Sequence, residues 1–217
     1  MNEYRKILLG ELSRLGILEL GEFQLKHNEK NPQAAKSIFK VNLRIREHGG
    51  PLTPSAVKAI AEEMYLLIRG EKIRFDRISG IPQAGEPFAE ELSRLSGKPL
   101  LRLRKEDSKE GRKIVSVLGN DFYAGQTVLL IDDVLTQGYS KEEAIIVIRN
   151  AGLIISDLVV VVDREQGGYE FLKGIGCNEH RLFSILEVLS RNLAIGRISR
   201  EKMEEIMAQI RAEKRIH

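Results

Sequence analysis

The stretch 128–140 constrains the fold of this chain of 217 residues more than any other part of it. Its first four residues, Val128 to Ile131, are all apolar, as in the strands of a parallel sheet that is covered on both faces. Two adjacent carboxylates, Asp132 and Asp133, follow directly, and a turn of small and hydroxyl residues comes next. The stretch therefore predicts a buried strand that ends in two acids and turns into a loop.

A helix is expected to begin directly after this turn. Ser140 is a favoured N-cap residue and Glu143 stands three residues later, as in a capping box, so a helix is predicted from Lys141 to Asn150. The N–H groups of the turn and the positive end of the helix dipole favour a phosphate group. Since the two acids can accept hydrogen bonds from hydroxyls, the stretch predicts a site for a phosphorylated, hydroxyl-rich ligand.

Strands and helices alternate over most of the chain, which indicates an α/β fold with a doubly wound, mainly parallel sheet flanked by helices. Helices are expected at 2–15, 54–68, 87–95, 141–150, 184–189 and after Ser199, and strands or extended segments at 18–25, 37–44, 73–79, 100–103, 114–118, 127–131, 158–162 and 181–183. No linker is evident, so we predict a single domain over 1–217. It would comprise a small N-terminal hood at about 1–45, a core at about 70–170 and a helical tail at about 180–217.

Three of the expected strands end in polar loops that contain glycine, at 80–85, 132–140 and 163–168. In a doubly wound sheet, ligands bind outside the carboxyl ends of the strands, near the point where the winding reverses. We therefore expect these loops to meet and to form the site. The most charged stretch, 104–113, has no apolar residue and is expected to be a further loop.

The charge balance argues against a surface that binds polyanions. The chain has 34 Lys and Arg residues against 31 Asp and Glu residues, so its net charge is only +3 and we expect no nucleic-acid partner. No apolar run of membrane-spanning length and no signal peptide is evident, so we expect no membrane partner. The single Cys177 excludes an internal disulfide and a cysteine-based metal site. A cytoplasmic protein is the natural expectation.

The sequence at 128–140, Val-Leu-Leu-Ile-Asp-Asp-Val-Leu-Thr-Gln-Gly-Tyr-Ser, resembles the loop by which type I phosphoribosyltransferases bind phosphoribosyl pyrophosphate (PRPP). That motif is specific, because it combines a hydrophobic strand, two acids and then Thr-x-Gly-x-Ser/Thr. Within the family the chain is most similar to the enzymes that use orotate, over nearly its whole length. Four other segments carry this similarity: Gly-Glu-Phe-Gln-Leu-Lys at 21–26, Arg-Lys-Glu at 104–106, Asp-Arg-Glu-Gln-Gly-Gly at 163–168, and His-x-Leu-Phe-Ser-Ile at 180–185.

The resemblance implies an enzyme that transfers the ribose 5-phosphate group of PRPP to orotate. The products would be orotidine 5′-monophosphate and pyrophosphate, in pyrimidine (UMP) biosynthesis. It also implies Mg²⁺ as cofactor, bound mainly through PRPP near Asp132 and Asp133 with no direct protein ligand expected. In this family the charged loop, here 104–113, reaches the neighbouring subunit, so a homodimer is implied.

The resemblance also implies roles for individual residues. PRPP would be bound by Lys26, Gln83, Ala84, Gly85, Arg104, Lys105, Asp132, Asp133, Val134, Leu135, Thr136, Gln137, Gly138, Tyr139 and Ser140. Orotate would be recognised by Lys26, by the backbone around Lys40 and Val41, and by Thr136 and Arg164. The transition state carries negative charge on the leaving pyrophosphate and positive charge on the sugar. The residues implied in catalysis are therefore cations and acids, namely Arg104, Lys105, Lys109, Asp132 and Asp133.

Some positions depart from the pattern that is usual in the family. Lys109 is displaced by one position in the charged loop, Glu110 replaces a histidine or an aromatic residue, and Ala84 replaces a lysine that many members carry. Two alternatives therefore stay open. One is a non-catalytic regulator that binds PRPP or a nucleotide on the same fold, and the other is a phosphoribosyltransferase for another nucleobase. No basic helix-turn-helix is evident before Ser37, which favours an enzyme.

Overall fold

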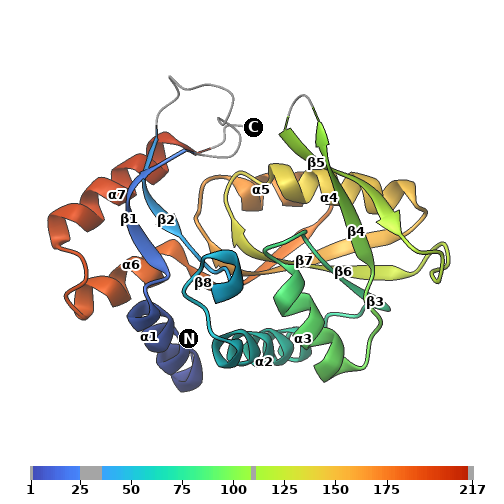
Figure 1. Ribbon diagram of the computed structural model, residues 1–217, viewed down its shortest axis with the longest axis horizontal. Helices are drawn as coiled ribbons and strands as arrows, with labels where there is room; N and C mark the ends of the chain where they lie inside the picture. Colours follow the sequence, from blue (N-terminus) through green and yellow to red (C-terminus); the bar gives the residue numbers. More distant parts are fainter. Residues whose placement is uncertain (1, 25–35, 109–110, 215–217) are drawn as a thin grey trace.

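The computed structural model describes residues 2–24, 36–108 and 111–214, and a four-stranded parallel sheet lies at its centre (Figure 1). The strands lie in the order β3-β6-β7-β8, with the bounds Arg77–Gly80, Thr127–Leu135, Ile154–Asp163 and Asn178–Ser184. Each neighbouring pair in this sheet is parallel. The expected parallel sheet flanked by helices is thus confirmed.

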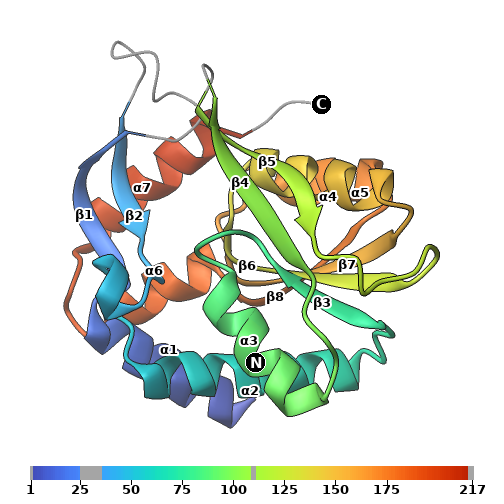
Figure 2. The ribbon, with the colours of Figure 1, turned by 45° about the vertical axis from the view of Figure 1, so that its right-hand side comes forward.

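Helices cover both faces of this sheet, which explains why its two central strands, β6 and β7, each contain a long apolar run. Two helices lie on one face and two on the other: α2 and α3 (Pro54–Gly70, Glu86–Ser96) and α4 and α5 (Tyr139–Asn150, Gly168–Gly174) (Figures 1 and 2). Along β6 the side chains alternate between two apolar clusters. Leu129 and Ile131 belong to the cluster that contains α2 and α3 residues, whereas Val128 and Leu130 belong to the cluster that contains α4 residues.

The winding of the sheet reverses between β3 and β6. Ile78 of β3 pairs with Leu129 of β6 on one side and forms a parallel bridge with Leu100 on the other. The chain reaches Leu100 through α3 and returns to β6 only after an antiparallel hairpin, β4 (Arg102–Ser108) and β5 (Gly111–Leu118). The carboxyl ends of β3 and β6 are therefore where ligands bind in sheets of this type.

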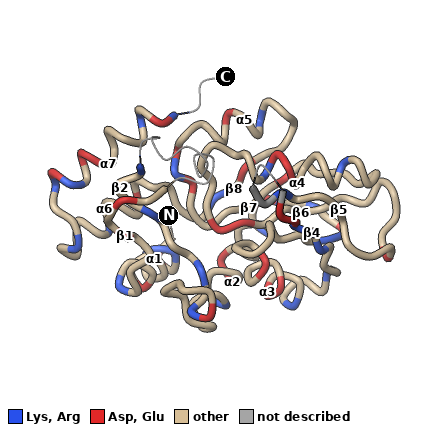
Figure 3. The backbone as a smooth tube through the Cα atoms, turned by 45° about the horizontal axis from the view of Figure 1, so that its top comes forward, with Lys and Arg blue, Asp and Glu red and all other residues tan. Residues whose placement is uncertain are grey.

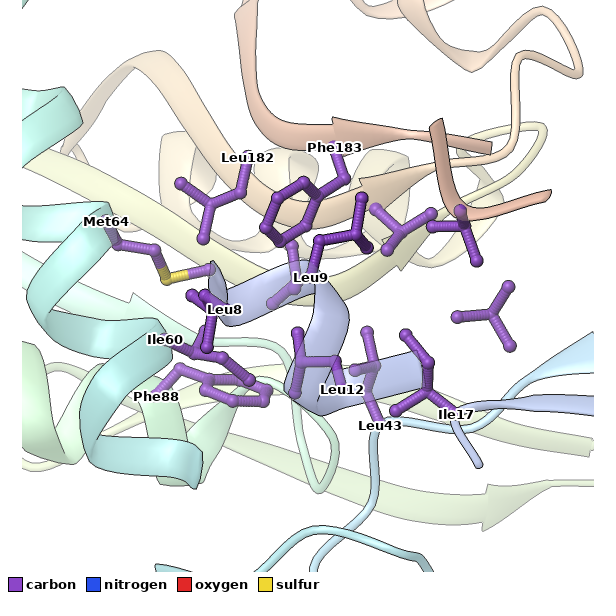
Figure 4. Packing of buried hydrophobic residues seen from close by; sticks show 14 of the residues in the cluster. Leu8, Leu9, Leu12, Ile17, Leu43, Ile60, Met64, Phe88, Leu182 and Phe183 are labelled. Atoms are coloured by element: carbon purple, nitrogen blue, oxygen red, sulfur yellow. The ribbon is translucent and has the colours of Figure 1, made fainter. Parts of the chain in front are cut away.

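The two ends of the described chain pack together on one side of the sheet (Figure 1). They contain α1, β1, β2, a short 3₁₀ helix, α6 and α7, with the bounds Glu3–Leu15, Leu18–Phe23, Ser37–Val41, Arg46–His48, Ile185–Ala194 and Arg200–Ala212. Leu9 and Leu12 of α1 are buried in the same apolar cluster as Met64 and Phe88 (Figure 4). The division of the chain into hood, core and tail stays a prediction.

Helices α1, α2 and α6 begin or end at residues that are favoured in caps. The side chain of Thr53 accepts from the N–H of Ala56 at the start of α2, and Ser184 forms a capping box with Glu187 at the start of α6. Gly16 ends α1 in the left-handed conformation that glycine tolerates best.

Three expectations about the elements were wrong in part. Strand β3 is shorter than the expected strand 73–79 and begins only at Arg77. The stretch 104–113 lies in the β4–β5 hairpin where it is described, because Leu103 and Ile114 anchor this charged segment in an apolar cluster. Helix α5 was not predicted, since a helix of seven residues that begins at a glycine gives almost no periodic signal.

Lys and Arg residues are interspersed with Asp and Glu residues along the backbone, in keeping with the small net charge (Figure 3). None of the helices in the described part of the chain combines the length and the apolar character that crossing a lipid bilayer requires.

Candidate active site

The three loops that were expected to meet lie at one edge of the parallel sheet. The N–H of Ile81, after β3, donates to the carbonyl of Ile131 in β6 at 2.8 Å. The N–H of Arg164, after β7, donates to the carbonyl of Leu135 at the end of β6, also at 2.8 Å. Main-chain hydrogen bonds therefore hold the loop after β3 and the loop after β7 to β6, the strand that carries the two acids near its end.

The loop after β6 differs from the prediction at its junction with α4. The helix begins at Tyr139, and its N-cap is Gly138 with φ of 90°, so Ser140 lies inside the helix and the expected capping box is absent. Glu143 instead accepts a hydrogen bond from the N–H of Ile114 in β5, at 3.4 Å. A glycine at the N-cap leaves the N–H groups of the first turn without a side-chain acceptor from this residue, as an anion-binding turn requires.

The first acid of the pair is buried and ion-paired. The side chain of Asp132 is 3% exposed, and its Oδ2 lies 2.5 Å from Nζ of Lys141, which is 5% exposed. Its Oδ1 accepts from the N–H of Asp133 at 2.9 Å. The same ammonium donates to the carbonyl of Val134 at 2.6 Å. The charge of Lys141 thus lies between the acids and the start of α4.

Lys141 was not among the residues expected at the site. A lysine in the first turn of a helix is ordinarily solvated, so neither its type nor its position marked it. The available signal was indirect, because two adjacent carboxylates at the end of a buried strand require a cation close by.

The second acid is only partly buried and titrates abnormally. Burial, and after it the adjacent carboxyl of Asp132, raise the pKa of Asp133 to about 7, although the charge of Lys141 opposes the shift. The folded protein therefore binds a proton at Asp133 over a range of pH in which the unfolded chain has released it.

Asp133→Asn is expected to flatten the dependence of stability on pH. Because the folded-state pKa lies above the ordinary value for an aspartate, this group makes the free energy of unfolding fall as pH rises from about 4 to about 7. Urea unfolding at pH 5 and pH 7.5 should show a smaller fall in the variant than in the wild type, by on the order of 2 kcal/mol. Glu47→Gln, at an exposed carboxylate, is the matched control. Equal falls in wild type and Asp133→Asn would contradict this assignment.

The turn after β3 packs its backbone directly against the end of β6. A Cβ atom added to Gly85 would lie 2.3 Å from the carbonyl oxygen of Ile131 and 3.1 Å from Cα of Asp132. Gly85 also forms the N-cap of α3. The structure thus brings Gly85, the last residue of the turn that also contains Gln83 and Ala84, next to the strand residues Ile131 and Asp132.

Gly85→Ala is expected to destabilise the protein by about 2 kcal/mol, because the added methyl group must displace the backbone of β6. Gly70→Ala is the matched control, since a Cβ there meets no atom within 4 Å. Thermal unfolding of the two variants measures the difference. A Gly85→Ala variant as stable as Gly70→Ala would show that the turn moves away from β6 without cost.

Arg164 extends from the end of β7 to strand β2. It is 5% exposed, its guanidinium carbon lies 4.1 Å from the centre of the Phe39 ring, and Nη2 donates to Oγ of Ser37 at 3.3 Å. Burial lowers the pKa of Arg164 to about 10, so the group remains protonated at neutral pH. The buried Nε has no hydrogen-bond partner in the described structure. A buried cation with an unused donor suits a planar anionic ligand.

Strand β2 presents its alternate residues to opposite sides. Ser37, Phe39 and Val41 are buried, whereas Lys40 is partly exposed, and its Nζ lies 3.9 Å from Oε2 of Glu19. The side chain of Lys40 therefore points away from the side that carries the Arg164 contacts. Only its backbone can take the expected part in the site, and Ser37 and Phe39 are contacts that sequence reasoning missed.

Helix α7 reaches the same region with its C-terminal end. The carbonyl of Glu213 accepts from Nε2 of Gln137 at 2.7 Å, and its carboxylate accepts from Nε2 of Gln166 at 2.5 Å. Gln209, one turn earlier, donates to the carbonyl of Lys36 and accepts from the N–H of Ile38. The helix thus connects the loops after β6 and β7 with β2.

The hairpin of β4 and β5 lies beside α4, the helix that follows the loop after β6. Ile114 of β5 is buried in the cluster that contains Ala144 of α4, and Lys105 faces Ile114 in the hairpin register. Arg104 is exposed and its Nε lies 3.1 Å from Oε1 of Glu106.

The remaining expected residues fall into two groups. Val134 and Leu135 are the last residues of β6, which runs four residues past the expected end at Ile131, so the two acids lie within the strand near its end. Thr136, Gln137 and Gly138 form the turn, and Tyr139 and Ser140 are already helical. Lys26, Lys109 and Glu110 lie outside the described residues.

The described residues contain no group of three or more His, Cys, Asp or Glu side chains arranged to hold a metal ion. Mg²⁺ commonly keeps water ligands and binds to substrate phosphates beside one or two carboxylates. The acid pair fits an ion of that kind, whose ligands are mainly phosphate and water oxygens. Two surface hollows, of about 380 and 510 Å³, are lined by residues of α1, α2 and their caps and by none of the expected site residues.

Comparison with known proteins agrees with this geometry. The family model described as phosphoribosyl transferase domain matches residues 52–175. An orotate phosphoribosyltransferase of Methanocorpusculum labreanum is 31% identical over 84% of this chain and 98% of its own length. One from Caenorhabditis elegans is 29% identical over 92% of this chain and 82% of its own. The structure of Leishmania donovani UMP synthase superposes with a TM-score of 0.78 at 26% identity, and covers 96% of this chain, which spans 42% of that protein.

The fold, the strand that carries Asp132 and Asp133, and the loop that follows this strand are those of a phosphoribosyltransferase domain. Because the similarity to orotate phosphoribosyltransferases extends over most of each chain, this class can be narrowed to one family. The chain belongs to the orotate phosphoribosyltransferase family.

Proposed function

We propose that the chain transfers the ribose 5-phosphate group of PRPP to orotate, forming orotidine 5′-monophosphate and pyrophosphate in pyrimidine biosynthesis. Its family membership supports this function. One structural observation carries the proposal. At one edge of the sheet, the loop after β6 meets the turn at Gly85 and the buried Arg164.

PRPP would lie across the ends of β3 and β6. The turn at 136–140 suits a 5′-phosphate, because α4 begins there at a glycine N-cap and the positive end of its helix dipole faces the turn. The edge of the sheet that carries Asp132 and Asp133 would face the ribose hydroxyls. Gln83, Ala84 and Gly85, next to these acids, would then contact the pyrophosphate.

Orotate would bind between the ends of β6 and β7 and strand β2. Its carboxylate matches the guanidinium of Arg164, which is buried, protonated and has an unused Nε donor. Thr136, Lys26 and the backbone around Lys40 and Val41 complete the proposed set. The stacking of Arg164 on Phe39 holds the planar guanidinium in a fixed orientation, which supports recognition of a planar ligand.

The chemistry requires charge stabilisation more than a proton relay. As the bond between ribose C1 and pyrophosphate breaks, negative charge grows on the leaving group, and cations held beside it lower the barrier. Arg104 and Lys105 on the hairpin, together with Lys109, which lies outside the described residues, are the proposed source of that charge. When bound, Mg²⁺ supplies further neutralisation of the pyrophosphate oxygens. The exposure of the hairpin strand at Arg104 and Glu106 is consistent with its reaching a neighbouring subunit of a homodimer.

A panel of acceptor bases tests the proposal. The protein is incubated with PRPP, Mg²⁺ and one of orotate, uracil, hypoxanthine or adenine, and pyrophosphate release is followed. Release is expected with orotate alone, since only orotate carries the carboxylate that pairs with Arg164. Faster pyrophosphate release with another base would show that this base, and not orotate, is the acceptor. PRPP binding without release for any base would indicate a non-catalytic regulator.

A further inference from the structure

The ammonium of Lys141 lies under the proposed PRPP loop and contacts oxygens from three parts of it. Nζ is 2.5 Å from Oδ2 of Asp132, 2.6 Å from the carbonyl of Val134 and 3.5 Å from Oγ of Ser140. Its side chain is only 5% exposed. A buried ammonium is stable only where oxygens surround it, so these contacts hold strand end, turn and helix start in one arrangement.

The same contacts make the two acids unequal. Both carboxylate oxygens of Asp132 are engaged, one by Lys141 and one by the N–H of Asp133, and its side chain is 3% exposed. Asp133 is less buried, and one of its oxygens accepts from the N–H of Val134 at 2.7 Å. A ligand that approaches the edge of the sheet therefore meets Asp133 before Asp132.

We propose that Lys141 is a positioning residue that withholds Asp132 from the ligand and leaves Asp133 as the acid that receives the ribose hydroxyls. This inference rests on the proposed function and divides the work within the acid pair. The reason for this division is electrostatic. PRPP is a strong anion, and two uncompensated carboxylates beside PRPP would repel it. One lysine charge offsets one carboxylate and leaves the other for hydroxyl contacts.

A cycle of variants tests this division through the dissociation constant of PRPP in the presence of Mg²⁺. Asp133→Asn is expected to weaken PRPP binding at least about 10-fold, because it removes the carboxylate that accepts from the hydroxyls. Lys141→Met is expected to weaken binding by a similar factor, about 10-fold, because it leaves the carboxylate of Asp132 buried without its cation. The double variant Lys141→Met/Asp132→Asn, which removes both charges, should regain most of the lost affinity.

The double variant also keeps the test informative if Lys141→Met alone fails to fold, since a neutral pair leaves no unpaired charge. Lys173→Met, at an exposed lysine of α5, is the matched control and should bind PRPP as the wild type does. In steady-state assays the loss in Lys141→Met should fall mainly on KM for PRPP, with kcat less affected. A loss confined to thermal stability, with KM unchanged, would overturn the positioning role.

Two further results separate this inference from the proposed function. If the wild type binds PRPP but the double variant binds it as weakly as Asp133→Asn, Asp132 itself contacts the ligand and only the inference fails. If the wild type binds no PRPP, the proposed function fails and the inference fails with it.

Discussion

Replacing Arg164 by alanine is expected to raise KM for orotate about 100-fold, with KM for PRPP changed little. Arg164 is the buried cation closest to β2, and it is held by Ser37 and by the ring of Phe39. A charge-assisted pair with a carboxylate in such a site is worth about 3 kcal/mol when one partner is removed, which corresponds to a factor of about 100. Steady-state kinetics with each substrate varied in turn measures both constants.

Two variants control for other consequences of losing this arginine. Arg164→Lys keeps the positive charge but not the planar fork, so it should recover only part of the orotate affinity. Arg69→Ala removes an arginine that lies over the ring of Tyr65 on α2, and it should leave both KM values unchanged. If Arg164→Ala raised KM for PRPP as much as KM for orotate, Arg164 would maintain the conformation of the whole site and would not specifically recognise the acceptor base.

Replacing Lys105 by alanine is expected to lower kcat about 100-fold while the dissociation constant of PRPP changes much less. Lys105 lies in the hairpin, opposite Ile114, and the proposal has the hairpin act on the leaving pyrophosphate only as its charge develops. Single-turnover rates with saturating PRPP measure the effect on the chemical step. Arg102→Ala, which removes a cation of the same strand that pairs with Glu90, is the control and should retain kcat. Equal losses in kcat and PRPP affinity would mean that Lys105 only binds substrate.

Mixing two variants of low activity shows which subunit provides the hairpin. If Lys105 acts in the neighbouring subunit's site, hybrids of Lys105→Ala with Asp133→Asn contain one site with both residues intact. Refolding an equimolar mixture should then restore part of the activity. No recovery in a mixture that forms hybrid dimers would place Lys105 and Asp133 of the same chain in one site.

The parts of the site that lie on main-chain features could be predicted from sequence. The apolar run before Asp132 and Asp133 is typical of a strand in a parallel sheet that is covered on both faces, and the ends of parallel strands meet at one edge. The predicted meeting of the loops therefore followed from local pattern alone. Their main-chain hydrogen bonds confirm it.

The parts that depend on tertiary packing could not be predicted in this way. Lys141 is buried only because β6 ends against the first turn of α4, and nothing local distinguishes it from a solvated lysine. Ser37 and Phe39 reach Arg164 across 127 and 125 positions of sequence, so only the folded chain relates them. Gly138 took the place expected for Ser140 because its positive φ turns the chain two residues earlier.

The measurement that tests the account most directly is the loss of orotate absorbance in the presence of the protein, PRPP and Mg²⁺. The account predicts that orotate is consumed only when PRPP is present, with pyrophosphate released in equal amount and with Asp133→Asn far slower than the wild type. No loss of orotate at high protein concentration, in a protein that still binds PRPP, would contradict it.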